Sequence, residues 1–188
     1  MNNNYDEILK SGLIKVNQKK YDESKKYFLK LTNLDDKRHE GYLNLSNVLV
    51  IEKKHKEAKD LLQKYLKKND PHSEIINGLA INLFNSNNYN ELNKHVDLYL
   101  VNYDNYLLNY LKGFCLNNID NNTQSEIFLK KSISLNNTFW PPYELLFRIY
   151  DKRSKLSEME ALMKKSKIVF SKNHNYSYFE ALYYYRIS

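Results

Sequence analysis

The sequence repeats with a period of about 34 residues, and this periodicity constrains the fold more than any other feature. Four related tetrapeptides mark the repeat, and a weaker copy fills the gap before the last of them. Their starts recur at this period, except that the interval between the third and the fourth start is one residue shorter. One such unit cannot bury its apolar face alone, so we expect the units to stack on one another. The tetrapeptides begin at Tyr21, His55, Tyr89, Asn122 and Leu156.

Upstream of each tetrapeptide the sequence predicts a first helix with two recurring positions. About nine residues before the tetrapeptide stands a residue that is small in four of the five units, which lets two helices approach closely. This position holds Gly12, Ser46, Ala80, Gly113 and, as the exception, Phe147. Four residues earlier the side chain is large in most units, with Asn109 as the departure. The large residues are Ile8, Tyr42, Ile76 and Tyr143.

The tetrapeptide itself opens a second helix with one apolar face. Apolar or small residues follow each other there at a spacing of four and then three, which lines one side of a helix. The chain has only four Gly and three Pro, and this scarcity favours helices joined by short connections. Pro141 and Pro142 suit the first turn of a helix. The spaced residues are Ser24, Phe28 and Leu31, then Ala58, Leu62 and Tyr65, then Leu92, Val96 and Tyr99.

With this frame the chain resembles the tetratricopeptide repeat family over residues 5–173. The resemblance implies an all-α fold, a right-handed α-solenoid of about five helix hairpins plus a C-terminal helix. We expect a single domain over residues 1–188. Its repeats would cover residues 5–38, 39–72, 73–105, 106–139 and 140–173, with a terminal helix at 174–188.

Family members that bind chaperone tails resemble one another in a Lys and Asn clamp at the fifth and ninth positions of the first helix. Here those positions hold Leu9 and Leu13. This departure argues against binding of a terminal Glu-Glu-Val-Asp tail.

The charge of the chain is unevenly distributed. The net charge is +7, with +5 in residues 1–70, −4 in residues 71–128 and +6 in residues 129–188. A basic, acidic and basic order is unlike a continuous nucleic-acid-binding stripe, so we expect no nucleic acid partner. The start of the chain has neither the basic region nor the apolar run of a signal peptide, and no stretch approaches a membrane span. We therefore expect a cytoplasmic protein.

The sequence offers no catalytic constellation, so we predict a protein that is not an enzyme and has no cofactor. The five histidines are scattered, without the spacing of a helical ligand pair, and no metal site is predicted. The single cysteine, Cys115, lies near Gly113 in a predicted helix and fits a small buried residue better than a nucleophile.

The remaining candidate site is the groove that the first helices of such a solenoid would line. Asn donates and accepts hydrogen bonds, so it suits the backbone of an extended peptide, while Tyr110 and Phe114 could take an apolar side chain. Arg148 could pair with a carboxylate. The alternative is that these residues only face solvent. The predicted partner-binding residues are Asn47, Asn77, Asn85, Tyr110, Phe114, Asn117 and Arg148.

The final segment, residues 174–188, is too apolar for an ordinary capping helix. It could be a cap that exposes tyrosine hydroxyls, a docking surface for a second chain, or the start of further repeats. As a docking surface it would make the chain a possible homo-oligomer, with Tyr176, Phe179 and Tyr183 at the interface.

The sequence thus favours a non-catalytic protein–protein interaction scaffold, or adaptor, that binds a peptide or protein in the concave groove. The alternative is an accessory repeat domain of, or partner to, a larger enzyme such as a sulfotransferase or glycosyltransferase.

Overall fold

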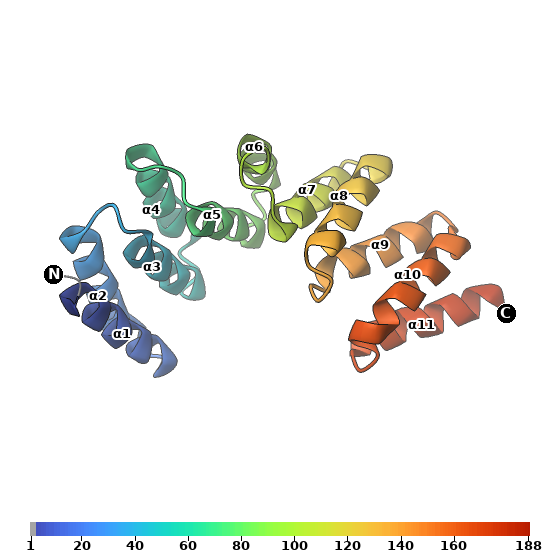
Figure 1. The fold of residues 1–188 in the computed structure, drawn as a ribbon, viewed down its shortest axis with the longest axis horizontal. Helices are drawn as coiled ribbons and strands as arrows, with labels where there is room; N and C mark the ends of the chain where they lie inside the picture. The colour runs from blue at the N-terminus through green and yellow to red at the C-terminus, as the bar shows by residue number, and fades with distance from the viewer. Residues whose placement is uncertain (1–2) are drawn as a thin grey trace. The chain divides into compact units, whose positions relative to one another are not determined.

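The computed structural model describes residues 3–188, and over this range the chain consists of eleven α-helices joined by short turns (Figure 1). The predicted all-α solenoid of five hairpins and a terminal helix is confirmed, and every tetrapeptide begins a second helix. The helices are α1 (Asn3–Asn17), α2 (Tyr21–Leu34), α3 (His39–Ile51), α4 (His55–Lys68), α5 (Ser73–Asn85), α6 (Tyr89–Leu100), α7 (Tyr106–Asn118), α8 (Asn122–Leu135), α9 (Pro141–Lys152), α10 (Leu156–Phe170) and α11 (His174–Ile187).

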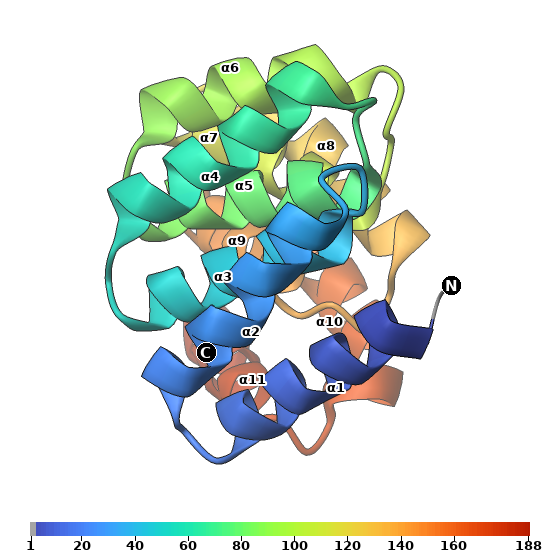
Figure 2. The same ribbon diagram turned by 90° about the vertical axis from the view of Figure 1, so that its left-hand side faces the viewer.

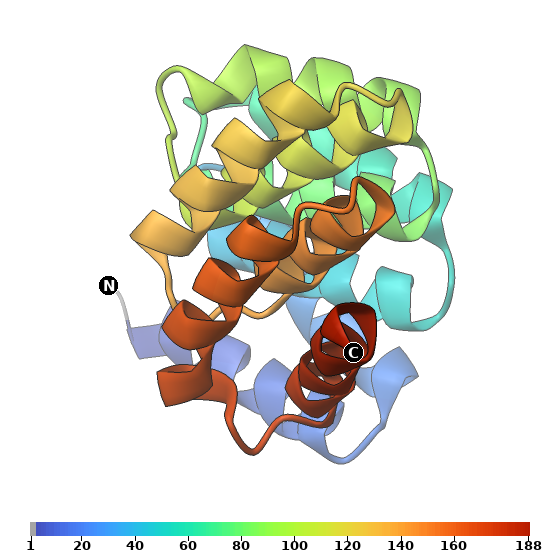
Figure 3. The ribbon, with the colours of Figure 1, turned by 90° about the vertical axis from the view of Figure 1, so that its right-hand side faces the viewer.

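The helices form two compact units that divide within α6, one ending at His95 and the other running from Val96 to Ser188. In the first unit each helix from α1 to α5 packs against the next, and the first helix α3 also contacts α1 on one side and α5 on the other (Figure 2). In the second unit α7, α9 and α11 are related in the same way, with α8 and α10 packed against them (Figure 3). That both units form one domain stays a prediction.

The turn within each hairpin contains one residue in the left-handed backbone region. These residues have φ between 52° and 61°, and none of them is glycine. The residue that follows donates its N–H to a carbonyl five residues back, as Lys54 does to Leu49 at 2.8 Å. This bond satisfies a carbonyl that the end of the first helix would otherwise leave unpaired. The left-handed residues are Lys19, Lys53, Asn87, Asp120 and Ser154, which recur with the repeat period.

The small residue of the first helix lies where the two helices of a hairpin approach most closely. A methyl group added at Gly113 would stand 2.7 Å from Leu129 Cγ, in the facing helix α8. Ser125, also in α8, donates its hydroxyl to the Gly113 carbonyl at 2.8 Å. A methyl group at Gly12 would meet the buried ring of Phe28 in the same way. The repeat therefore selects a small residue for steric reasons.

A core of buried side chains runs along both faces of each hairpin. The residues that follow the predicted spacing of four and three on the second helices are buried in the first two repeats, for example Ala58, Leu62 and Tyr65. In the third repeat Leu92 and Val96 are buried and Tyr99 is half-buried. The large residues predicted on the first helices are buried as well. Asn109, which stands in their place in α7, is also buried and donates to Asp104 at 2.6 Å and to the Asn105 carbonyl at 2.8 Å. A polar side chain is thus retained in the core by local hydrogen bonds.

An aromatic cluster explains why Phe147 can stand at the otherwise small position. Its ring stacks on Phe179 of α11, with centroids 4.9 Å apart and planes 12° apart. Trp140 lies beside this pair and packs edge-on against Phe170, at 4.9 Å between centroids. In this unit the terminal helix therefore supplies the apolar partner that the large side chain requires.

One histidine belongs to the core of the first unit. His95 is buried and donates its Nε2–H to the carbonyl of Ile76 at 2.9 Å. Burial lowers the pKa of the His95 imidazole, and the hydrogen bond to Ile76 offsets part of that effect. The folded chain therefore favours the neutral ring.

Lys53→Gly should raise the free energy of unfolding by about 1 kcal/mol, because a side chain at positive φ carries a steric cost that glycine lacks. Urea denaturation of the variant measures the change. Lys64→Gly, at an exposed position inside α4, is the control and should lower the free energy of unfolding by about the same amount. Equal signs for the two variants would contradict this account of the turn.

Gly113→Ala should destabilise the chain by about 1–3 kcal/mol, since the added methyl group overlaps Leu129, which is fully buried and has no room to move. Gly78→Ala is the matched control within the first unit. There the new methyl group would overlap only Leu43 Cδ1, the tip of a half-buried side chain, so the helix preference of alanine should offset the contact. Thermal and urea denaturation compare the two, and an equal loss in both would refute the steric argument.

The free energy of unfolding should fall between about pH 7 and about pH 5 in part because of His95. The unfolded imidazole has its ordinary pKa near 6.5, so below that pH the unfolded chain binds a proton that the folded chain resists. His95→Gln keeps a donor for the Ile76 carbonyl and removes the titration, so its unfolding should depend less on pH. Urea denaturation at both pH values tests this, and an unchanged pH dependence would exclude the role of His95.

Candidate functional site

One side of every first helix is left open to solvent by the packing of the hairpins. Its residues stand at the fifth, ninth and twelfth or thirteenth positions of each repeat, counted from residues 5, 39, 73, 106, 140 and 174, a spacing that lines one face of a helix. We call this face the first-helix stripe. In the first unit it includes Leu9, Leu13, Leu43, Asn47, Asn77, Ile81 and Asn85. In the second unit it includes Tyr110, Phe114, Asn117, Glu144, Arg148, Asp151, Tyr178, Leu182 and Tyr185.

The stripe of the first unit combines aliphatic and amide side chains. Leu13 is 40% exposed and Ile81 is 43% exposed, so both present apolar surface to solvent. Asn47 and Asn85 are exposed, and Asn77 is half-buried. An extended peptide could place apolar side chains on the aliphatic residues and offer its backbone amides to the asparagines.

The stripe of the second unit begins with aromatic rings. Tyr110 lies 6.5 Å from Phe114 and 5.4 Å from Phe139 between ring centroids, the latter at an angle of 86°. Tyr106 meets Phe139 as well, at 5.0 Å. These rings are only partly buried, so they present apolar surface on α7 and near the end of the turn before α9. Aromatic side chains of this kind are common anchors in protein interfaces.

The same stripe continues with charged residues on α9. Glu144 accepts a hydrogen bond from Trp140 Nε1 at 3.1 Å and pairs with Arg148 at 2.9 Å. Asp151 pairs with Arg186 of α11 at 2.9 Å, which joins the two first helices. Because Arg148 is largely exposed, its pair with Glu144 is weak and can be exchanged for a carboxylate of a partner.

The seven predicted partner-binding residues all lie on these stripes, three in the first unit and four in the second. Asn47, Asn85 and Arg148 are exposed, whereas the others are half-buried. Sequence reasoning missed Tyr178 and Tyr185, which continue the stripe on α11 and are exposed. Tyr178 and Tyr185 stand one repeat period after Glu144 and Asp151, and this spacing could have identified them from the sequence.

The expected interface on the terminal helix needs a correction. Tyr176 and Phe179 are each only 2% exposed, because they pack back onto α9 and α10 within the same chain. Tyr183 is half-buried against the same core. Tyr176 and Phe179 are therefore core residues of this chain, and not the exposed interface that was expected. The exposed large apolar residues of α11 are instead Tyr178, Tyr184, Tyr185 and Ile187.

Two histidines that are far apart in the sequence meet where α3 and α5 begin. Ligand atoms of His39, His72 and Glu74 lie within 4.8 Å of one another. The two imidazole rings are stacked, with centroids 3.6 Å apart and planes 15° apart. A metal ion lies in the plane of each imidazole that binds it, so stacked parallel rings cannot share an ion as they stand. His72 Nδ1 also accepts the Glu74 N–H at 3.3 Å, which caps α5.

Cys115 carries the single thiol group of the chain. Cys115 is buried, and burial raises the pKa of its thiol to about 11. The thiol is thus protonated at neutral pH and is a poor nucleophile. None of the helices from residue 3 to 188 combines the length and the apolar character needed to cross a bilayer.

Comparison with known proteins identifies the repeat and the fold. A tetratricopeptide repeat family model matches residues 9–38, and no curated protein matches the sequence. YrrB, described as a TPR protein with an unusual peptide-binding site, has a TM-score of 0.68 at 13% identity, covering 93% of this chain and 90% of that chain. MamA from Desulfovibrio magneticus RS-1 has a TM-score of 0.74 at 11% identity, covering 93% and 99%. PilW, a type IV pilus biogenesis factor, has 0.73 at 17% identity, covering 97% and 93%. At these identities the likeness establishes the fold alone.

Proposed function

We propose that this chain, which carries a tetratricopeptide repeat and has the fold of tetratricopeptide repeat proteins, is a non-catalytic scaffold that binds a peptide or protein on its first-helix stripes. The observation that carries the proposal is the exposure of large apolar side chains on those stripes. Leu13 and Ile81 keep about two fifths of their surface open to water and stand with Leu9 and Leu43 on the open face of the first helices. Grouped apolar side chains of this kind mark an interaction surface, whereas singly exposed ones do not.

The chemistry of the two stripes predicts what each of them recognises. In the first unit, Leu13 and Ile81 suit aliphatic side chains, while Asn47 and Asn85 can bond a peptide backbone. In the second unit the aromatic rings around Tyr110 suit an apolar anchor, and Arg148 suits a carboxylate. We expect an elongated partner with apolar side chains and at least one acidic group. We also propose that the protein acts in the cytoplasm and without a cofactor.

Changes on the stripes should remove partners that affinity purification from the native host recovers together with the wild-type chain. Ile81→Asp should weaken binding to the first unit by about tenfold or more, since it places a charge on the apolar surface. Tyr110→Ala and Arg148→Ala test the second unit in the same way. Quantitative mass spectrometry of the captured proteins measures each loss.

Ile168→Asp is the matched control, because Ile168 is an isoleucine of even greater exposure that lies on the second helix α10. It should leave the partners of the stripes bound. Circular dichroism verifies that each variant is folded. If every partner survives Ile81→Asp, Tyr110→Ala and Arg148→Ala, the stripes are not the binding surface.

A further inference from the structure

The terminal helix α11 keeps the frame of a first helix. Ala181 stands one repeat period after Phe147, at the small position that Gly12, Ser46 and Gly113 occupy in earlier repeats. The face built on the fourth, eighth and eleventh positions of the repeat, counted from residue 140 for α9 and from residue 174 for α11, packs against the second helix in complete repeats. On α9 this face consists of Tyr143, Phe147 and Tyr150, all buried. On α11 it consists of Ser177, Ala181 and Tyr184, all exposed.

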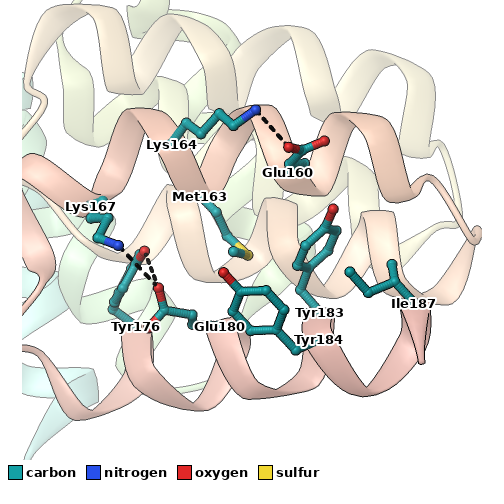
Figure 4. A pocket seen from close by; sticks show the side chains of 9 residues that line it. All are labelled: Glu160, Met163, Lys164, Lys167, Tyr176, Glu180, Tyr183, Tyr184 and Ile187. Atoms are coloured by element: carbon teal, nitrogen blue, oxygen red, sulfur yellow. Dashed lines mark hydrogen bonds and ion pairs between the residues drawn. The ribbon is translucent and has the colours of Figure 1, made fainter.

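A cleft of about 360 Å³ adjoins this face, between α10 and α11 (Figure 4). Glu160, Met163 and Lys164 of α10 form one wall, and Tyr183 and Tyr184 of α11 form the other (Figure 4). Lys164 and Glu160 form an ion pair at 2.6 Å. The cleft therefore has an apolar floor beside a charged rim.

The same arrangement exists one repeat earlier, where a helix covers it. Glu126 and Lys130 of α8 stand one period before Glu160 and Lys164, and they form the same ion pair, at 2.7 Å. Tyr150 of α9 likewise stands one period before Tyr184. It donates its hydroxyl to Glu126 at 3.0 Å. Tyr150 is 2% exposed whereas Tyr184 is 57% exposed, so the two sites share this tyrosine and the ion pair and differ in their cover.

The helix that covers the earlier site is α10, and its contacts describe what the cleft would accept. Lys155, at the start of α10, pairs with Glu126 at 3.2 Å. Further along, Glu158 and Leu162 lie beside Lys130 and Tyr150. Met159, Met163 and Ser166 are the residues of α10 that follow the spacing of four and three, and all are buried. A helix in the equivalent place on α11 would need a basic residue at its start and the same spacing of apolar or small residues.

We propose that the cleft between α10 and α11 binds an amphipathic helix of a partner protein, in the position that α10 takes on α9. The basic first turn of that helix pairs with Glu160, and its apolar face covers Ala181 and Tyr184. This site is separate from the first-helix stripes, so it does not depend on the function proposed for them. The partner is recognised by its helical apolar spacing and its N-terminal positive charge.

A peptide of residues 154–171 is the probe, because it contains the helix that already fills the equivalent site. A side-chain staple replacing Lys164 and Ile168, which are exposed in α10, keeps it helical and reduces the ordering cost of binding. Fluorescence anisotropy with the full chain should show saturable binding. The same peptide with Met163→Glu, which puts a charge on its apolar face, should not bind.

Two neighbouring tyrosines provide the decisive comparison. Tyr184→Ala should weaken peptide binding by about tenfold, the loss typical of an interface tyrosine. Tyr185→Ala should leave it unchanged, since Tyr185 is 75% exposed and lies outside the cleft. Both side chains are exposed, so both variants should stay folded, and circular dichroism verifies this.

Three results would overturn the proposal. The first is no saturable binding of the stapled peptide. The second is equal binding by the wild-type chain and Tyr184→Ala. The third is a dimer of the chain alone, measured by light scattering, that the change Tyr184→Ala dissociates. In that case the cleft holds a second copy of this chain and not a partner helix.

Discussion

The rest of the structure depends on the close contact between the two helices of each hairpin. At Gly12 and Gly113 the approach leaves no room for a methyl group, and the facing residues Phe28 and Leu129 fill the space completely. This contact fixes which face of the first helix is buried, and therefore which face is left open. The first-helix stripes are a direct consequence of that packing. Their exposed leucine, isoleucine and aromatic residues make the open faces suitable for binding.

Much of the fold could be predicted because its rules are local and periodic. The tetrapeptides locate the second helices to the residue, and the small residue before each of them locates the contact within the hairpin. The left-handed residues of the turns could not be predicted by residue type. Asn87 and Asp120 are common in that conformation, but Lys19, Lys53 and Ser154 are not. Only their place in the frame makes them equivalent.

The candidate site was less accessible to sequence reasoning, because apolar character alone does not say what covers a residue. Tyr176 and Phe179 were expected at an interface, yet they pack onto the preceding helices. Residues at the third and sixth positions of earlier first helices face inward too, as Leu108 and Leu111 do. His39 and His72 meet only because the repeat superposes residues that are about one period apart. By contrast, the Glu144–Arg148 pair follows from helical spacing alone.

The terminal helix also makes the chain extensible by whole periods. Ser188 stands one period after Ser154, the left-handed residue in the turn that precedes α10. A copy of residues 155–188, which is one full period, joined after Ser188 would therefore begin at the backbone position that precedes every second helix of this molecule. New units could be concatenated with no linker to design, since each junction repeats one that the chain already contains. Array length, and with it the number of open helix faces, becomes a quantity that an engineer can choose.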